Sequence, residues 1–370
     1  MGNKIYLNLI PQYKIEDIYE NLKEAYSFLN LKEVFKRGER ILLKPNFLSG
    51  FRSDKRPITT NKTLIEAVIL FFKDVGAKIY IGDSPALESS EGVAKRIGLY
   101  EICKKHGVKI VEFKEKREID LPNFSTIKKI NVAKEIFQFD HIINLPKLKT
   151  HTMMGLTLGV KNIYGVVVGR EKAKYHLNSG ENREIFAKML LGLYESISPT
   201  LTILDGIISM EGNGPSNGRA RDTGIFALSK DAKTLDVLIS KILNFPEEKN
   251  YVIKVIKEVF PEIYSLNGIE FFPKGIKDFQ VENFKLPQMI DCRWKLPDFI
   301  ANYLRDLFSP HLVINTQRCI KCERCVEACP TDSIKYKGKN LKIYSRKCIR
   351  CFCCQEVCPE DAIFVKKSVF

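Results

Sequence analysis

The first three hundred residues alternate between short apolar runs and longer amphipathic segments. The short runs predict buried strands, at 41–44, 78–82, 108–113, 140–145, 201–208 and 225–228. Segments with apolar residues three and four positions apart predict helices, at 15–35, 64–72, 89–106, 184–196 and 233–243. Strands that alternate with helices are typical of an α/β domain. We therefore expect an α/β fold with a mainly parallel, Rossmann-like sheet and flanking helices.

The pattern changes near residue 280. Pro287, Pro297 and Pro310 surround a short helix expected near 298–307, and proline-rich stretches commonly connect domains. We expect an α/β domain over 1–290, a linker over 291–311, and a small α+β domain over 312–370.

Nine of the 11 cysteines lie between Cys319 and Cys358. A Cys-x2-Cys-x2-Cys-x3-Cys-Pro run that begins at Cys319 recurs 29 residues later at Cys348, so the segment is an internal repeat. This spacing is typical of bacterial ferredoxins that carry two [4Fe–4S] clusters, in which the fourth cysteine of each run ligates the other cluster. The pattern implies one ligand set of Cys319, Cys322, Cys325 and Cys358, and a second of Cys348, Cys351, Cys354 and Cys329.

Structural zinc is the alternative for these cysteines. Zinc ribbons use two separated Cys-x2-Cys pairs and need neither the third cysteine nor the Cys-Pro of each run, so the spacing favours clusters. Cys353 lies between two ligands and is expected to be a thiol packed beside a cluster, while Cys103 and Cys292 are ordinary residues. The stretch 334–344 predicts a hairpin between the repeats.

The formal net charge is +15, from 59 Lys and Arg against 44 Asp and Glu. This charge favours anionic partners, but no helix-turn-helix, zinc-finger or ribonucleoprotein motif supports nucleic-acid binding. The longest apolar run, Leu64–Phe72, is too short to span a membrane. The first residues lack a secretory signal, so we expect a cytoplasmic protein with reduced, metal-binding thiols.

Polar side chains follow the predicted strands, and the carboxyl ends of parallel strands are where ligands bind in open α/β sheets. Taken singly, each of these residues is more simply a solvated lysine, a capping histidine or a turn carboxylate. Together they predict an anion pocket with acid–base groups beside it. The expected binding residues are Lys44, Asn46, Lys147 and Lys149, and the expected proton-transfer residues are His151, Asp83, Asp205 and Glu211.

Several ordered motifs resemble the domain-of-unknown-function family 362, whose members are iron–sulfur proteins that often carry a fused bacterial-type ferredoxin. The motifs are Lys44-Pro-Asn46, Gly82-Asp-Ser-Pro85, Leu145-Pro-Lys-Leu-Lys-Thr-His151, Lys161-Asn162-x-x-Gly165 and Asp205-Gly206 with Glu211-Gly-Asn-Gly-Pro215. The resemblance implies the same domain plan and adds Lys161 to the binding residues. It implies no substrate.

The favoured hypothesis is an oxidoreductase that passes electrons from a redox partner protein through two [4Fe–4S] clusters to an anionic substrate or cofactor in the α/β domain. One alternative is a non-catalytic electron carrier whose α/β domain docks a partner enzyme. Another is a protein that assembles clusters or metal cofactors. The sequence does not indicate the oligomeric state.

Overall fold

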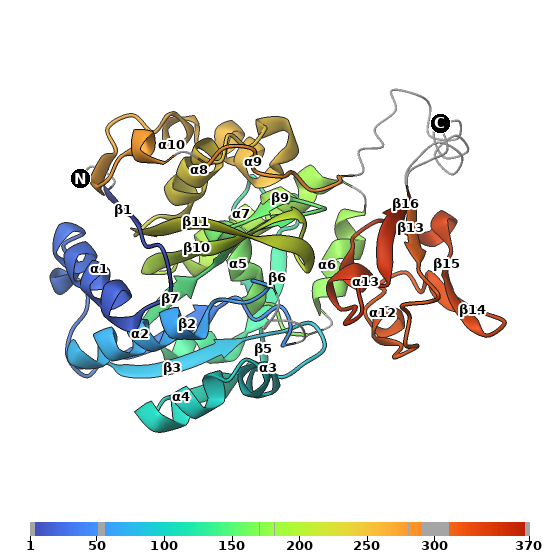
Figure 1. Ribbon diagram of the computed structural model, residues 1–370, viewed down its shortest axis with the longest axis horizontal. Coiled ribbons are helices and arrows are strands. Elements are labelled where there is room, and N and C mark those ends of the chain that lie inside the picture. The colour runs from blue at the N-terminus through green and yellow to red at the C-terminus, as the bar shows by residue number, and fades with distance from the viewer. Residues whose placement is uncertain are drawn as a thin grey trace.

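The computed structural model describes residues 4–50, 56–169, 171–180, 182–279, 281–289 and 311–366. They form a large α/β body and a smaller C-terminal body beside it (Figure 1). The helix expected near 298–307, the linker that contains it, and Cys292 lie outside the described residues. None of the helices in these ranges is long and apolar enough to cross a membrane.

A ten-stranded sheet forms the centre of the α/β body. Its strands follow the order β12 (Glu270–Pro273), β1 (Lys4–Leu9), β11 (Asn217–Ser229), β10 (Leu201–Asn213), β7 (His141–Leu145), β2 (Arg40–Pro45), β3 (Lys78–Asp83) and β4 (Lys109–Glu112). Strand β8 (Lys147–His151) pairs with β10 and with β9 (Gly155–Thr157). Strands β10, β7, β2, β3 and β4 pair in parallel, while β11 is antiparallel to β1 and β10. The expectation of a mainly parallel sheet is confirmed.

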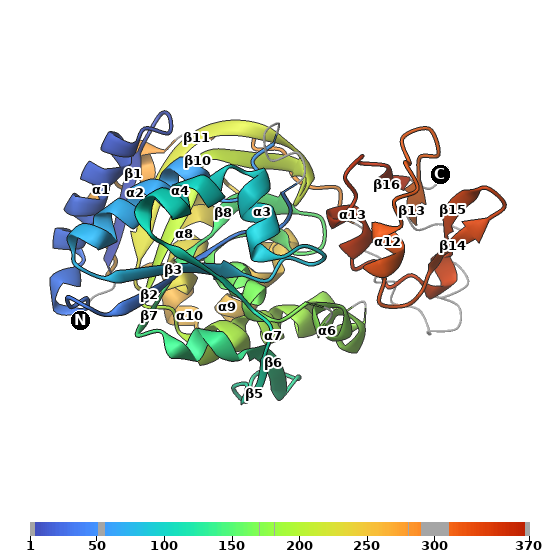
Figure 2. The same ribbon diagram turned by 90° about the horizontal axis from the view of Figure 1, so that it is seen from below.

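Helices cover both faces of this sheet (Figures 1 and 2). One face carries α1 (Ile15–Phe28), α2 (Lys62–Asp74), α3 (Ser90–Arg96) and α4 (Leu99–His106). The other carries α5 (Gly159–Asn162), α6 (Glu171–Ser179), α7 (Arg183–Ile197), α8 (Ala232–Ile242), α9 (Tyr251–Val259) and α10 (Pro261–Ser265). Successive strand residues point to opposite faces, and accordingly Ile41 and Leu43 pack in one hydrophobic cluster and Leu42 in the other.

Two expected helices are shorter than their apolar patterns. The helix expected over 15–35 ends at Phe28, because Asn30 adopts a left-handed backbone with φ of 52°. The helix expected over 89–106 is divided by Gly98, whose φ of 72° suits glycine, into α3 and α4. Asn61 and Asp231 begin α2 and α8 by accepting hydrogen bonds from backbone N–H groups of the first turn.

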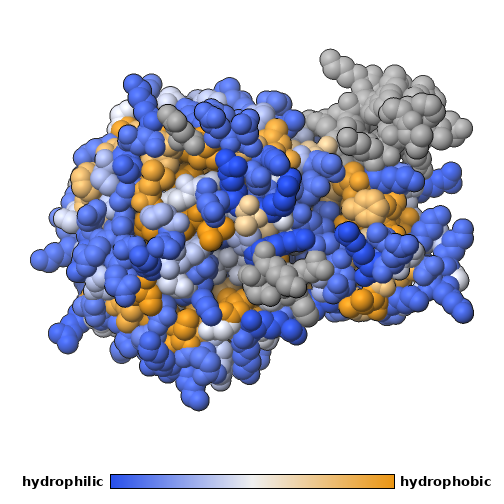
Figure 3. All heavy atoms as spheres, in the orientation of Figure 1, coloured by the Kyte–Doolittle hydropathy of each residue, from blue (hydrophilic) through white to orange (hydrophobic). Residues whose placement is uncertain are grey.

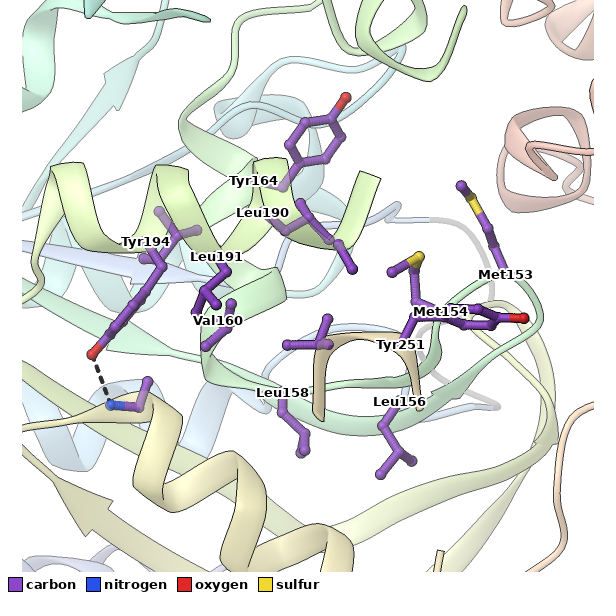
Figure 4. Packing of buried hydrophobic residues seen from close by; sticks show 14 of the residues in the cluster. Met153, Met154, Leu156, Leu158, Val160, Tyr164, Leu190, Leu191, Tyr194 and Tyr251 are labelled. Carbon is purple, nitrogen blue, oxygen red and sulfur yellow. Dashed lines mark hydrogen bonds between the residues drawn. The ribbon is translucent and has the colours of Figure 1, made fainter. Parts of the chain in front are cut away.

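Close packing fixes the layer around α5, α7 and α9. Figure 4 shows Leu190 and Leu191 of α7 near Val160, with Met154 and Tyr251 further along the same cluster. The Tyr194 hydroxyl accepts a hydrogen bond of 2.8 Å from the backbone N–H of Ala232 at the start of α8 (Figure 4). These contacts hold α7 and α8 against the sheet near the start of β10, where Thr202 pairs with Ser229 of β11.

The remaining short elements lie outside the main layers. They are the β5–β6 hairpin (Lys116–Asp120, Lys129–Ala133) and the 3-10 helices η1 (Leu31–Glu33), η2 (Lys134–Gln138), η3 (Ile163–Val166), η4 (Glu247–Lys249), η5 (Ile276–Asp278) and η6 (Ser345–Lys347).

The C-terminal body reproduces the sequence repeat in its backbone. It contains the strand pair β13–β16 (His311–Ile314, Ile363–Lys366), the hairpin β14–β15 (Ile334–Lys337, Asn340–Ile343), and the helices α12 (Arg324–Glu327) and α13 (Cys353–Glu356). The two helices are offset by 29 residues, and left-handed residues recur at the same offset, as at Glu323 and Phe352. The hairpin predicted over 334–344 is confirmed.

A substitution at Phe72 tests how α2 packs on the sheet. The Phe72 side chain is fully buried, with its ring centroid 5.0 Å from that of Phe35 and 5.3 Å from that of Phe71. We expect Phe72→Ala to lower the free energy of unfolding by about 3–5 kcal/mol, because it leaves a cavity in the core. Urea unfolding followed by circular dichroism measures the loss. Phe137→Ala, at a side chain 43% exposed, is the control and should cost about 1 kcal/mol or less; equal losses would contradict the packing.

Candidate functional site

Two buried ion pairs lie at the carboxyl edge of the sheet. Lys44 Nζ is 2.9 Å from Asp83 Oδ1, and Lys147 Nζ is 2.8 Å from Asp205 Oδ1. Burial lowers the pKa of both lysines, and the facing carboxylates oppose that shift. Each charge removed from water therefore has a partner of opposite sign.

Backbone groups hold the Asp83 carboxylate in place. It accepts hydrogen bonds from the N–H of Phe47 at 2.7 Å and of Ser84 at 2.9 Å. Gly165 packs directly against the ion pair, where an added Cβ would collide with Asp83 Oδ1 and Lys44 Nζ. A larger residue at this position would displace the pair.

The second ion pair borders a different cavity, of about 610 Å³, whose lining includes Tyr13, Asn61 and Lys147. Asp205 also accepts hydrogen bonds from the Tyr13 hydroxyl at 2.6 Å and the Asn61 N–H at 2.8 Å. Lys147 donates to the same Tyr13 hydroxyl at 2.7 Å. The group ties β8 and β10 to the N-terminus of α2, and it does not line the cavity that contains the first pair.

Lys149 is buried without a carboxylate partner among the described residues. Its Nζ donates to Asn46 Oδ1 at 2.8 Å and to the Ile58 carbonyl at 2.6 Å. Burial lowers its pKa well below the usual range. Asn46 continues a chain of side-chain amides, donating to Asn162 Oδ1, while Asn162 donates to Asn144 Oδ1, each at 2.8 Å.

His151 joins the two bodies. Its Nδ1 accepts hydrogen bonds from the N–H groups of Met153 and Met154, at 3.1 and 3.3 Å. The ring proton therefore lies on Nε2, which is 3.1 Å from Glu356 Oε1 of α13. Burial lowers the pKa of His151 to about 4. This histidine is a neutral donor that positions Glu356.

Glu211 lies apart from the other predicted residues. Its Oε2 accepts the N–H of Lys285 at 3.1 Å. The glycine-rich segment that follows it forms the closed end of the β10–β11 hairpin, where Asn213 faces Asn217.

A cavity of about 100 Å³ lies between the two bodies and contains part of the predicted site. Of the predicted residues, it is lined by Lys44, Asn46, Asp83 and Lys161. The other lining side chains with polar or ionisable groups include Thr157, Tyr164, Lys172, His176, Cys353 and Glu356. The structure thus brings together four predicted residues and adds groups that sequence reasoning missed.

The sequence contains only weak indications of the residues that sequence reasoning missed. Lys172 and His176 lie four residues apart on α6, a spacing that places both on one helix face but is equally typical of a solvated helix. Glu356 corresponds to Glu327 in the repeat, whereas Cys353 replaces Arg324. The extra cysteine is the one departure from the repeat that marked α13 as unusual.

The cavity carries a mixed but net positive charge. Burial lowers the pKa of Lys161, and it lowers the pKa of Lys172 to about 8. Burial would raise the pKa of Glu356, yet the His151 hydrogen bond and nearby cations bring it to about 2. Three lysines, Lys44 among them, therefore face two carboxylates, since burial also keeps His176 neutral with a pKa of about 3.

Two buried polar atoms of the lining residues have no hydrogen-bond partner among the residues that the structure describes. They are His176 Nδ1 and Thr157 Oγ1. Lys161 also has no carboxylate within ion-pair distance in the part of the chain that the structure describes. Buried polar atoms normally have partners, so these groups have hydrogen-bonding capacity for a bound molecule.

The cysteines line two further cavities. Cys319, Cys322, Cys325 and Cys358 line one, and Cys329, Cys348, Cys351 and Cys354 line the other. We call these the first and second cysteine cavities. Within the described ranges no three metal-binding side chains converge on a point as single-ion ligands would. Each cavity is lined by four cysteines, and four thiolates are the ligand number of one [4Fe–4S] cluster.

Several polar contacts among the described residues hold the C-terminal body on the α/β body. Besides His151–Glu356, Arg56 Nη1 is 2.6 Å from Asp361 Oδ2 and Arg324 Nη2 is 3.2 Å from Glu88 Oε1. The others join Thr152 to Gln355, Ser216 to the Glu356 carbonyl, and Asn217 to the Ile363 carbonyl. One hydrophobic cluster also includes residues of both bodies.

Fold and cysteine arrangement define an α/β protein with a fused ferredoxin-type domain. Residues 311–359 match the 4Fe-4S dicluster domain. Residues 41–241 match the domain of unknown function DUF362, and the chain belongs to that family.

The chain is also similar to a relative and to a solved structure. The chain is 36% identical over 256 residues to the thylakoid-associated protein sll1697 of Synechocystis sp., covering 69% of this chain and 78% of that protein. It also aligns with the lactate racemase apoprotein from Thermoanaerobacterium thermosaccharolyticum, at a TM-score of 0.43 and 14% identity. That alignment covers 64% of this chain and 57% of the racemase chain.

We expect His151→Ala to weaken the contact between α13 and the α/β body. The substitution leaves the mostly buried Glu356 carboxylate without its donor, at a cost of roughly 3 kcal/mol. Hydrogen exchange should become faster in α13 and in β8–β9. His106→Ala removes a similar histidine–carboxylate contact, 2.9 Å to Glu66, far from the seat and should leave α13 protected. Unchanged exchange in the His151 variant would show that the contact does not hold the two bodies together.

Proposed function

We propose that the protein is an oxidoreductase that delivers electrons from its ferredoxin domain to a small oxyanion held in the cavity between the two bodies. The observation that carries the proposal is that one helix borders both this cavity and the second cysteine cavity. Helix α13 contributes Cys353 and Glu356 to that cavity, while Cys354 of the same helix lines the second cysteine cavity. A molecule in the cavity would lie one helix away from the second ligand set.

The two cysteine sets are the proposed ligands of two [4Fe–4S] clusters, in the crossed arrangement that the repeat implies. Such clusters, when bound, supply electrons one at a time. Backbone N–H groups already point at the sulfurs of the fourth cysteines: Ser333 N–H to Cys329 Sγ and Ala362 N–H to Cys358 Sγ, both at 3.3 Å. Donors of this kind stabilise thiolate ligands and tune the cluster.

The cavity's size limits the substrate. At about 100 Å³ it has room for roughly three water molecules, at ~30 Å³ each. Nucleotide cofactors and drug-sized ligands need pockets of about 300–1,000 Å³. A molecule of a few heavy atoms therefore fits, and a nicotinamide or flavin does not.

The lining favours an anion that takes up protons. Lys44 is fixed by Asp83, whereas Lys161 and Lys172 supply positive charge without a carboxylate partner at contact distance among the described residues. Lys172 Nζ donates to the Ser84 carbonyl, and its pKa of about 8 suits proton donation near neutral pH. In this proposal Lys161 orients the oxyanion and Lys172 delivers a proton as electrons arrive.

Lys172→Met tests this assignment. A panel of nitrite, sulfite, formate and bicarbonate is added to dithionite-reduced protein freed of excess reductant, and reoxidation is followed by absorbance. At least one anion should reoxidise the wild type. The variant should need about tenfold more of it or worse, because a charged hydrogen bond contributes about 1.5–3 kcal/mol.

Lys174→Met is the matched control, since Lys174 is exposed on the same helix. It should behave as the wild type with unchanged iron content. A panel that is inert toward the wild type would contradict the proposal and favour a non-catalytic electron carrier or a cluster-assembly protein.

Cys329→Ser tests the crossed ligation. We expect it to damage the cluster held by Cys348, Cys351 and Cys354 and to spare the other, because the fourth ligand comes from the opposite run. Electron paramagnetic resonance of the reduced variant, with iron and sulfide counts, distinguishes the two clusters. Cys353→Ser is the control and should retain both. Loss of only the cluster beside Cys319 would refute the crossing.

A further inference from the structure

We propose that an acidic electron-carrier protein docks on the outer face of the C-terminal body and delivers electrons to the first cysteine cavity. We define the outer face as the loop 318–322 with the hairpin β14–β15. The inference rests on the proposed function in one respect, because it requires the cysteine sets to hold redox clusters.

The two halves of the repeat differ in exposure. In the first half Lys321 and Glu323 are exposed, and Ile320 is 61% exposed. Their counterparts 29 residues later are Arg350, 7% exposed, and Phe352, 0% exposed. The backbone is the same in both halves, with φ of 57° and 53° at Lys321 and Arg350. The first cysteine cavity is therefore the one reached from solvent, and the second is covered.

The hairpin borders the first cysteine cavity. Leu341 lines that cavity, and the Tyr336 hydroxyl donates to Glu323 Oε1 at 2.8 Å, next to Cys322, which is itself exposed. In both ribbon views the hairpin lies at the end of the C-terminal body away from the α/β body (Figures 1 and 2). A protein bound here would approach the first ligand set without displacing the seat.

The outer face carries unpaired positive charge. Five exposed basic side chains have no ion pair or side-chain hydrogen bond to any of the described residues: Arg318, Lys321, Lys335, Lys337 and Lys339. Some exposed lysines of the α/β body are paired, as Lys129 is with Glu118 and Lys134 with Glu115.

The carboxylates of the C-terminal body offset this charge only in part. Glu356 and Asp361 face the α/β body, and Glu323 accepts the Tyr336 hydroxyl. Glu360 lines the first cysteine cavity, and Glu327 and Asp332 are exposed near the outer face. Facing charges of opposite sign steer and orient a charged partner, so the excess of basic groups selects an acidic one.

Apolar side chains lie among these charges. Ile320 is 61% and Tyr336 48% exposed, and Figure 3 shows hydrophobic patches between hydrophilic side chains on this end of the molecule. An apolar centre with a charged rim is the usual composition of a protein interface. Electron-transfer complexes are small and short-lived, which suits a face of this extent.

The triple variant Arg318→Glu, Lys321→Glu, Lys337→Glu tests the outer face. The probe is flavodoxin, an acidic one-electron carrier protein, and the first readout is its binding in the oxidised state by calorimetry. We expect the wild-type affinity to fall as salt rises, and the variant to bind about tenfold more weakly or worse at low salt. Reduction by flavodoxin hydroquinone should slow by a similar factor, while reduction by dithionite stays unchanged.

The matched control is Lys14→Glu, Lys32→Glu, Lys36→Glu. It makes the same charge change at exposed lysines near α1, at the opposite end of the molecule (Figures 1 and 2). It should bind flavodoxin as the wild type does. An equal loss in the control, or no loss in the outer-face variant, would overturn the proposal.

Anionic vesicles distinguish a lipid surface from a protein partner. If the outer-face variant lost only its sedimentation with phosphatidylglycerol vesicles and bound flavodoxin normally, the face would be a membrane contact and the proposal would be wrong. The proposed function fails separately, because an inert oxyanion panel leaves flavodoxin binding and cluster reduction measurable.

Discussion

Burying lysine at the carboxyl edge of the sheet constrains everything around it. Lys44, Lys147 and Lys149 are almost completely buried, and an unpaired buried charge is very costly. Strand register supplies the partners: Asp205 faces Lys147 in the β10–β8 pairing, and Asp83 ends β3 beside β2, which carries Lys44. Lys149 instead donates to neutral oxygens, and burial lowers its pKa well below the usual range. The strand pairing therefore supplies the partners that these buried lysines require, and the lysines in turn constrain which strands can pair there.

The same constraint creates the seat of the ferredoxin domain. Strand β8 presents Lys147, Lys149 and His151 along one side, and the last of these ends at Glu356 of α13. Because Nδ1 of His151 accepts two backbone N–H groups, its only donor is aimed at that carboxylate. Glu356 in turn closes the cavity. A histidine that looks like an acid–base catalyst in the sequence thus acts on the site through another residue's position.

The sequence predicted what periodicity and spacing encode. The strands β2, β3 and β7 and the helices α2, α7 and α8 arise from local apolar patterns, and the ferredoxin repeat is visible in cysteine spacing alone. It did not predict β8, because Lys147 and Lys149 look solvated until the tertiary partners Asp205 and Asn46 are known. It also did not predict Lys172, His176 or Glu356 as neighbours of Lys44, since their proximity depends on how α6 and α13 dock, which no local pattern records.

The seating of the two bodies argues against a mobile carrier domain. A domain that swings between partners needs a small, polar interface, whereas here one hydrophobic cluster runs from Leu148 and Met153 to Phe352 and Ile363, and ion pairs flank it at Arg56 and Arg324. Electron transfer weakens steeply with distance, so in the proposed function a fixed α13 keeps the cavity and the second ligand set in one geometry. In the same proposal, a body that does not swing receives its electrons from a molecule that diffuses, and the exposed half of the repeat is the part that such a molecule reaches.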